Sequence, residues 1–514
     1  MSPKPPDSRG ATFKLNVAAN YASQAYAGLI GLVMVPVYLR LMSGEAYGLV
    51  GFFALLQAWA QLLDLGLSAT VAREAARHAG GAGDSHGFRC LLRVFEWMFW
   101  FTGALLAVLF ALGAEAVANS WLNVRALPAQ DVRAALQAMG LAVALRWIAG
   151  LYRGVIMGME RQVWLNVFNA AVVSLRFVGV LPVLWWMDAS VIGFFVFQAV
   201  VSVAELAVLT ITALRLAPAD RSRPVRPDWP VLGPALRFSA GIAFATIVWV
   251  VVTQADKLVL SATMPLAEYG YFTAAVTAAS AASLLSAAVS QAILPRLTQL
   301  AASGQEGEIT ALYRRTTRLV MVFGMPPALG LVFLAEPVLW AWTGDRSFAR
   351  DYAAVLALYA AGNGFLTLTV FPYYLQYARG DLRLHVWGNA LFAAVLVPAI
   401  LYAATVHGAM GTAWVWAGAN AAFFLLWTPI VHRRFAPGVH EAWLVQDILR
   451  PIALPLAMGA AAAWAIPPDA GRMAAATAVA LACSLMCGAA GAVSGMGRRL
   501  ESPPLYSQDE GRLP

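Results

Sequence analysis

The sequence predicts an all-α protein that crosses a lipid bilayer about fourteen times, as two repeated six-helix halves followed by two further helices. Of its 514 residues, 60% are hydrophobic and only 12% are charged, whereas soluble domains carry about 25% charged residues. The apolar residues gather in runs close to the roughly 20 residues that a bilayer-spanning helix needs. The cationic residues concentrate in every second gap between these runs, as expected when cytoplasmic loops hold the positive charge.

The predicted spans are helices, because only a helix satisfies its own backbone hydrogen bonds in lipid. They cover residues 15–39, 45–69, 93–118, 134–158, 164–187, 190–215, 237–263, 268–292, 316–341, 352–378, 384–405, 408–431, 450–467 and 473–496. With the N-terminus in the cytoplasm, 26 of the 35 Lys and Arg residues, Arg153 among them, fall on the cytoplasmic side and 6 on the outer side. A missed or invented span would invert the charges after it, so this asymmetry supports the count.

Polar breaks divide these spans into segments. The predicted segments are an N-terminal half 1–215, a basic cytoplasmic linker 216–236, a C-terminal half 237–431, a second cytoplasmic linker 432–449, the last two spans at 450–496 and a cytoplasmic tail 497–514. Because the topology explains the formal net charge of +8, we expect no nucleic-acid partner.

Two short motifs recur 222 residues apart and indicate an internal duplication. AYG at Ala46–Gly48 aligns with EYG at Glu268–Gly270, and GMER at 158–161 aligns with GDLR at 380–383. An even number of spans per half makes both halves enter from the same side, which is typical of transporters whose halves alternate access to a central cavity. A duplicated bundle with a purely structural role is the alternative.

Three segments carry a resemblance to a known family. They read VPVYLRLMSGEAYGLVGFFALLQAWAQLLDLGLSATVARE at 35–74, TQADKLVLSATMPLAEYGYFTAA at 253–275 and HGAMGTAWVWAGAN at 407–420. This pattern resembles bacterial polysaccharide flippases of the multidrug/oligosaccharidyl-lipid/polysaccharide exporter superfamily. The resemblance implies a protein of the bacterial inner membrane that moves a lipid-linked oligosaccharide, typically on undecaprenyl pyrophosphate, to the outer leaflet. It also implies polysaccharide polymerase or assembly proteins as partners.

Charged residues at mid-depth are candidates for the substrate site, since an ionised side chain at the bilayer centre costs about 2.5–3.5 kcal/mol. Arg146 and Arg176 lie near the middle of spans four and five, and arginine binds phosphate through paired donors. The alternative is that each pairs with a structural acid or extends to the interface. Glu205 and Asp256 are the available acids and the candidates for ion coupling. Lys257 is a further substrate-binding candidate. Because Asp256 and Lys257 are adjacent on a helix, we expect them to be poorly placed to neutralise each other.

Polar residues on the first span form one helical stripe. Asn16, Asn20, Tyr21 and Gln24 follow the spacing i, i+4, i+5 and i+8. Asn20 and Gln24 are therefore candidates for a cavity wall that binds substrate, with a hydrogen-bonded seam between helices as the alternative.

The sequence favours a transporter over an enzyme. It contains no glycine-rich nucleotide loop with a lysine, no His-Glu metal motif and no Ser/His/Asp cluster in a loop, so we expect no catalytic or metal-binding residues and no cofactor. A membrane glycan polymerase would need a larger outer loop than the spans leave. A lipid II flippase and a multidrug or cation antiporter of the same superfamily are closer alternatives, although arginines at mid-depth would repel a cationic substrate.

Overall fold

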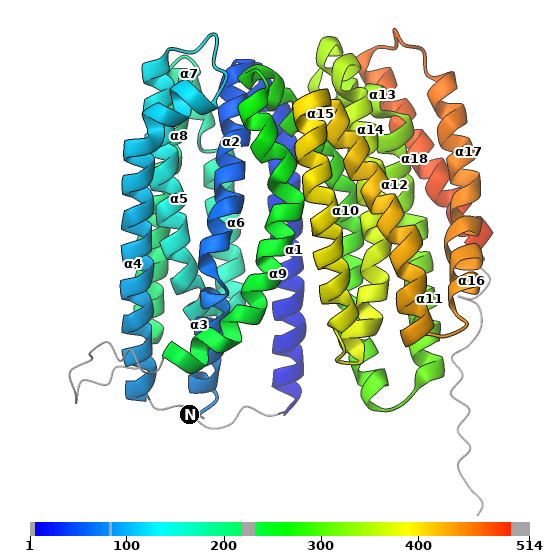
Figure 1. The fold of residues 1–514 in the computed structure, drawn as a ribbon, viewed down its shortest axis with the longest axis horizontal. Helices are drawn as coiled ribbons and strands as arrows, with labels where there is room; N and C mark the ends of the chain where they lie inside the picture. Colours follow the sequence, from blue (N-terminus) through cyan, green and yellow to red (C-terminus); the bar gives the residue numbers. More distant parts are fainter. Residues whose placement is uncertain (1–5, 82–84, 218–231, 495–514) are drawn as a thin grey trace, which may run out of the picture. The chain divides into compact units, whose positions relative to one another are not determined.

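The computed structural model describes residues 6–81, 85–217 and 232–494, with only the backbone described for residues 6–18, 232–242 and 282–292. Nearly all of this described part is helical (Figure 1), which confirms the all-α fold class. The linker predicted at 216–236 lies mostly outside the described residues, and the tail predicted at 497–514 lies entirely outside them.

Contacts divide the chain into two compact units. One consists of Met1–Ala281 with Val386–Trp416, and the other of Ala282–His385 with Ala417–Pro514. Two long helices, α10 (Leu266–Ala302) and α15 (Arg383–Phe435), run from one unit into the other. The sequence division into halves at residue 215 stays a prediction.

The first unit is built around α5, which packs against α4 and α8 (Figure 1). Buried Phe95 and Phe99 of α4 form a core with Trp147 of α5 and Leu209 of α8. Its helices are α1 (Pro6–Leu41), α2 (Gly44–Ala60), η1 (Gln61–Asp64), α3 (Leu67–Ala79), α4 (Ser85–Ala116), η2 (Val117–Trp121), α5 (Ala129–Gly158), α6 (Gln162–Phe177), α7 (Leu181–Trp186), α8 (Val191–Leu216) and α9 (Leu232–Thr263).

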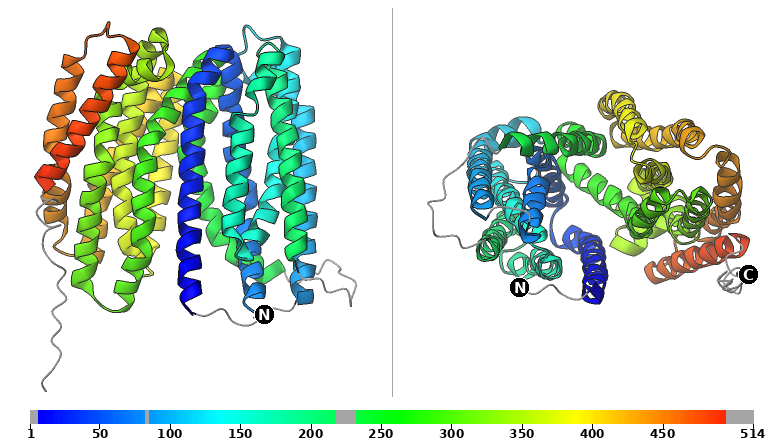
Figure 2. Two further views of the ribbon diagram at one scale, coloured as in Figure 1. Left: turned by 180° about the vertical axis from the view of Figure 1, so that it is seen from behind. Right: turned by 90° about the horizontal axis from the view of Figure 1, so that it is seen from below.

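The second unit holds the helices between α10 and α15 and those that follow α15. Its last two helices, α17 and α18, pack against each other and are the orange and red helices of Figure 2. The helices are α11 (Glu306–Phe323), α12 (Met325–Phe333), α13 (Ala335–Thr343), α14 (Arg346–Ala378), α16 (His440–Ala442), η4 (Trp443–Leu449), α17 (Arg450–Ala465) and α18 (Arg472–Ser494).

Twelve helical segments of the described chain are long and apolar enough to cross a membrane, so the protein is a multi-pass membrane protein. One of them, Arg383–Phe435, turns at Gly408, where φ is 58°, and covers both spans predicted at 384–405 and 408–431. The helix α10 lies where the eighth span is predicted but is not among the twelve. The number fourteen therefore stays a prediction.

The glycines of the duplicated AYG and EYG motifs lie at a close approach of α2 and α10. A Cβ atom on Gly48 would lie 2.2 Å from the carbonyl oxygen of Leu266, and one on Gly270 would lie 2.8 Å from the carbonyl oxygen of Gly44. Only glycine allows two backbones to come this near. The two motif copies therefore make one helix contact together.

The start of α5 is fixed by a carboxylate from α2. Glu45 accepts hydrogen bonds from the backbone N–H groups of Arg125, Ala126 and Leu127 at 2.7, 2.8 and 2.9 Å. These bonds satisfy three donors of the loop before α5 and replace the hydration that the buried carboxylate loses. The loop thereby sets the position of α5, which carries Arg146 and Arg153.

A buried carboxylate also joins two helices of the second unit. Asp447 of η4 is fully buried and accepts from Nε of Arg314 at 2.5 Å, while Nε of Arg318 lies 3.5 Å from its other oxygen. Next to this group, the indole N–H of Trp443 donates to Thr317 at 2.9 Å. We name these contacts the Asp447 latch, because they attach α11 to η4.

Candidate functional site

Three arginines of the first unit line one cavity, and two of them contact the same carboxylate. Arg146 and Arg153 lie seven residues apart on α5, which is two helical turns and places them on one face. Arg176 comes from the last turn of α6. The guanidinium groups of Arg153 and Arg176 each contact a different oxygen of Glu205, which α8 contributes.

Glu205 belongs to a polar stripe on an otherwise apolar helix. Gln198, Ser202 and Glu205 follow the spacing i, i+4 and i+7, so they share one face of α8. All three are buried, and the N-terminus of α8 is capped by Ser190, whose hydroxyl accepts from the N–H of Gly193 at 3.2 Å. The face that points to α5 is therefore the polar one.

The charge of Glu205 is balanced by two cations of unequal exposure. Its side chain is 1% exposed, while that of Arg176 is 15% and that of Arg153 is 38% exposed. Burying a carboxylate is costly unless it is paired and hydrogen-bonded, and here each oxygen has its own guanidinium. Arg153 is thus the more accessible of the two cations that Glu205 holds.

Arg146 is bonded differently, because its partners in the described structure are neutral oxygen atoms. Its guanidinium donates to Gln57, to Gln198 at 2.7 Å and to Ser202 at 3.1 Å. It also lies 4.8 Å from the centre of the Phe53 ring, a cation–π distance. These contacts orient the side chain, and none of these hydrogen-bond partners is a carboxylate.

The three guanidinium groups line a cavity of about 440 Å³. One of its walls carries Asp64, which accepts from the N–H of Ser68 at 3.1 Å and from its hydroxyl at 2.5 Å. Three cations against two carboxylates leave the site with one formal positive charge. The other polar lining residues are Gln57, Gln61, Ser68 and Thr246.

The structure therefore brings together three of the residues that the sequence singled out. Arg146 and Arg176 both line the cavity, and Glu205 bonds to Arg176. Asn20 and Gln24 are exposed on α1 and bond to each other at 3.2 Å, and they are not among the cavity-lining residues. The side chain of Asn16 lies outside the described residues.

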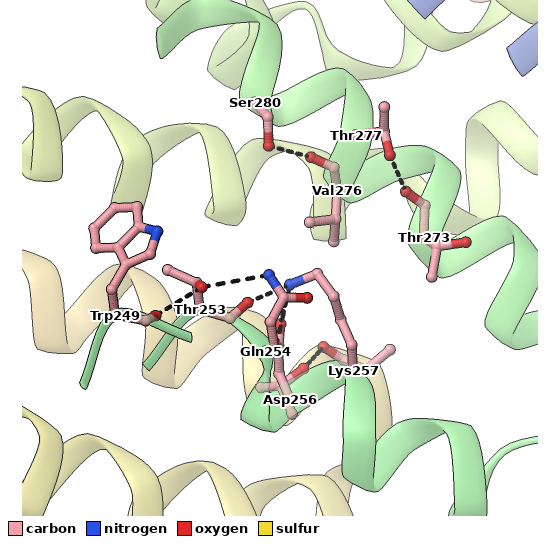
Figure 3. A network of polar contacts seen from close by, with 11 residues as sticks. Trp249, Thr253, Gln254, Asp256, Lys257, Thr273, Val276, Thr277 and Ser280 are labelled. Atoms are coloured by element: carbon pink, nitrogen blue, oxygen red, sulfur yellow. Dashed lines mark hydrogen bonds and ion pairs between the residues drawn. The ribbon is translucent and has the colours of Figure 1, made fainter. Parts of the chain in front are cut away.

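Asp256 and Lys257 form a separate pair on α9. Nζ of Lys257 lies 3.1 and 3.2 Å from the two oxygens of Asp256 and 2.8 Å from the carbonyl oxygen of Thr253 (Figure 3). The expectation that these helix neighbours are poorly placed to neutralise each other is wrong, because the flexible lysine chain folds back along its own helix. The Asp256 side chain is 3% exposed and that of Lys257 is 19% exposed.

Arg153 was missed as a site residue, because the sequence assigns it to the cytoplasmic side. The spacing does contain a signal for it. Arg153 lies two helical turns from Arg146, and the polar residues Gln198, Ser202 and Glu205 of α8 are also spaced to share one helix face. Gln57 and Asp64 carry no comparable signal. Among the described residues there is no group of three or more His, Cys, Asp or Glu side chains that would hold a metal ion.

Family models and solved structures resemble this chain over most of its length. A family described as "Polysaccharide biosynthesis protein" matches residues 13–301, and one described as "Lipid II flippase MurJ" matches residues 189–468. No curated protein sequence matches the chain.

Several solved transporters share the fold at low sequence identity. A lipid II flippase MurJ in an inward closed conformation has a TM-score of 0.70 and 13% identity, with 94% of this chain and 99% of that chain covered. An inward-facing multidrug resistance MATE family transporter has a TM-score of 0.62 and 11% identity, with 80% and 96% covered. A transporter of the same superfamily from Pyrococcus furiosus has a TM-score of 0.53 and 13% identity, with 81% and 96% covered.

Proposed function

This chain belongs to the polysaccharide biosynthesis protein family of the multidrug/oligosaccharidyl-lipid/polysaccharide superfamily, and we propose that it flips a lipid-linked oligosaccharide across the bacterial inner membrane. The observation that carries the proposal is the cavity lined by Arg146, Arg153 and Arg176. An excess of positive charge suits a phosphate-linked headgroup, and undecaprenyl pyrophosphate is the carrier that we propose.

The arginines would bind a pyrophosphate in two different ways. Arg146 is held by neutral oxygens, so an incoming anion gains its charge without breaking an ion pair. Arg153 and Arg176 are engaged by Glu205, and the substrate must share or exchange these contacts. Such a site selects an anion and can also release it, because the ion pairs of Glu205 with Arg153 and Arg176 re-form when the substrate leaves.

In the proposed cycle the headgroup enters the cavity from the cytoplasmic leaflet and leaves toward the outer leaflet, while the polyprenyl chain stays in lipid. Both termini are cytoplasmic in this scheme, and no covalent step is required of the protein. Glu205 and Asp256 are our candidates for coupling to an ion gradient or to the membrane potential, where each charge moved across 100 mV supplies about 2.3 kcal/mol. Polysaccharide polymerase or assembly proteins would receive the product outside.

A lipid II flippase is the second candidate, and the match of residues 189–468 to the MurJ family model favours it. The two substrates share a pyrophosphate, so the arginines serve either. A cationic drug is disfavoured, because three guanidinium groups would repel it in a cavity of low dielectric constant. The two phosphate substrates are separated by expressing this chain in living cells depleted of their lipid II flippase. Growth of those cells would favour lipid II as the substrate, and no growth would favour the lipid-linked oligosaccharide.

The test is the leaflet location of the glycolipid. Cells lacking this protein are converted to spheroplasts and labelled with an impermeant sugar-binding probe before and after lysis. We expect label on intact wild-type spheroplasts and label only after lysis in the deletion strain. Equal exposure in both strains would contradict the proposal.

Variants in that strain test the cavity itself. Arg146→Gln and Arg153→Gln should each lower outer-leaflet label about tenfold, the value of one charge-assisted hydrogen bond. Arg77→Gln is the matched control, because Arg77 forms an exposed pair with Glu74 at 3.1 Å in the same unit. Normal transport by both cavity variants and by their double variant would remove these arginines from the substrate site.

A further inference from the structure

A second hollow lies on the lipid-facing side of the first unit, between α4, α5 and α8. Its volume is about 460 Å³, and Arg93, Glu96, Trp97, Trp100 and Tyr152 contribute to its lining. The helix α4, at the edge of the first unit (Figure 1), exposes a long apolar face that includes Phe101 at 70%. In a membrane protein such a face meets lipid, so the hollow opens to the bilayer.

The polar floor of this hollow is unusual for a surface that meets hydrocarbon. The Glu96 side chain is only 9% exposed, and its carboxylate accepts a hydrogen bond from Nη1 of Arg93 at 2.8 Å. A nearly buried carboxylate needs partners that replace its hydration, and the close charged partner of Glu96 in the described structure is Arg93. Here the hollow beside it is open, and the Arg93 side chain is 56% exposed.

The remaining bonds of Glu96 are long. Tyr152 donates its hydroxyl to Glu96 at 3.4 Å, and the indole N–H of Trp100 donates to Tyr152 at 3.3 Å. Hydrogen bonds of hydroxyl groups are normally 2.7–2.8 Å long. The second carboxylate oxygen of Glu96 is therefore weakly satisfied and suited to a closer donor.

Two indole rings complete the hollow. Trp97 and Trp100 are 64% and 47% exposed, one turn apart from each other and next to the charged pair. Tryptophan is enriched at the depth of lipid headgroups, and its ring attracts a cation. The charge pattern of the sequence places this end of α4 at the cytoplasmic interface, where headgroups lie.

We infer that this hollow binds the headgroup of a phospholipid that carries both a phosphate and a primary ammonium group, as phosphatidylethanolamine does. The phosphate accepts from the exposed guanidinium of Arg93, and the ammonium group donates to Glu96 beside the indoles. Since Arg93 and Glu96 are in direct contact, they present opposite charges side by side, which matches the two charges of this headgroup. The inference does not depend on the transported substrate.

Other lipid classes fit the same residues less well. A trimethylated ammonium group has no N–H to donate to Glu96. A headgroup with a phosphate and no cation would bring a second anion toward the buried carboxylate. The hollow therefore predicts a preference that depends on Glu96 and not on the lipid tails.

The test is native mass spectrometry of the purified full-length protein in detergent, titrated with dioleoyl phosphatidylethanolamine, phosphatidylcholine or phosphatidylglycerol. We expect phosphatidylethanolamine to bind the wild-type protein about tenfold more tightly than the other two, as one charge-assisted hydrogen bond allows. Equal binding of all three, or tightest binding of phosphatidylglycerol, would overturn the inference.

Two variants assign the preference to the hollow. Glu96→Gln should abolish it, and Trp97→Leu, which changes an exposed side chain and leaves the core intact, should reduce it severalfold. The matched controls are Arg215→Gln, at the exposed end of α8, and Trp387→Leu, an exposed tryptophan of α15. Retention of the preference in both hollow variants, or its loss in a control, would contradict the site.

Discussion

Each unit of the protein contains a buried carboxylate held by two arginines, and the two groups differ in what surrounds them. Glu205 and Asp447 have side chains 1% and 0% exposed, and their arginine partners are 15% to 38% exposed. Burial and charge therefore do not distinguish them. The difference is that the partners of Glu205 line a cavity, whereas the Asp447 latch attaches α11 to η4.

The neighbours of the Asp447 latch are packing residues. Tyr313 is fully buried, and its hydroxyl forms a hydrogen bond of 2.7 Å with Nε2 of His432. Its ring stacks on that of Trp443, with 5.9 Å between the ring centres. Arg314 is further fixed by Gln446 at 2.8 Å. The residues around Asp447 thus bond to and stack on one another, whereas the arginines of Glu205 line a cavity.

The largest expected effect is on stability, from Asp447→Asn. Removing one partner of a buried ion group leaves uncompensated charge, at a cost of about 3–5 kcal/mol in the free energy of unfolding, so we expect a lower melting temperature in detergent and less folded protein. Glu205→Gln should lose less than half as much stability, because water in the cavity can solvate the released arginines. Equal losses of stability in the two variants would break the comparison.

A smaller effect should separate the two groups by transport. Arg153→Lys keeps the charge but loses the forked donor geometry, and we expect transport to fall about tenfold with an unchanged melting temperature. Arg318→Lys is the matched substitution in the Asp447 latch, where the contact is 3.5 Å long, and it should leave transport unchanged. The leaflet assay and thermal unfolding of both variants measure this, and a transport defect in Arg318→Lys alone would contradict the assignment.

The smallest effect concerns an exposed ion pair of the second unit. Asp381, between α14 and α15, accepts from the N–H of Arg383 at 3.1 Å and from Arg434 at 2.8 Å. These bonds, the backbone bond first, hold the pKa of Asp381 below its ordinary value of 3.8. The stabilisation is present above the ordinary value and is lost as the pH falls through the lowered pKa.

Thermal unfolding between pH 6 and pH 3 measures this contribution. Asp381→Asn should lower the melting temperature slightly at pH 6, and the difference from wild type should shrink toward the acid end. A difference that is the same at both ends would mean that the carboxylate charge has no part in it, and the exposed pair would no longer serve as a reference for the two buried groups.

The sequence predicts the membrane fold well, because hydrophobic run length and loop charge follow directly from bilayer thickness and topology. It also singles out Arg146, Arg176 and Glu205 as candidate site residues, since charge at mid-depth is costly. It does not predict that Arg153 joins them, because an apolar run has no sharp end that would fix the depth of a residue near its boundary.

Side-chain direction was the other limit of the sequence. The pairing of Asp256 with Lys257 depends on a lysine rotamer, and the exposure of Asn20 and Gln24 depends on which face of α1 meets a neighbour. Periodicity shows which residues share a helix face, but it does not show what that face contacts. The bend of α15 at Gly408, where φ is 58°, likewise follows from one backbone conformation that glycine permits and does not require.

The contact of Gly48 with α10 and of Gly270 with α2 has a consequence for symmetry. If the two motifs are copies, the same surface serves on both sides of the contact, as in the isologous interface of a two-fold dimer. A duplication turns an interface between two chains into one within a single chain, where each side can then change separately. Steric closeness removes that freedom here: a side chain larger than hydrogen at either glycine meets the backbone of the opposite helix, so each of the two positions stays restricted to glycine.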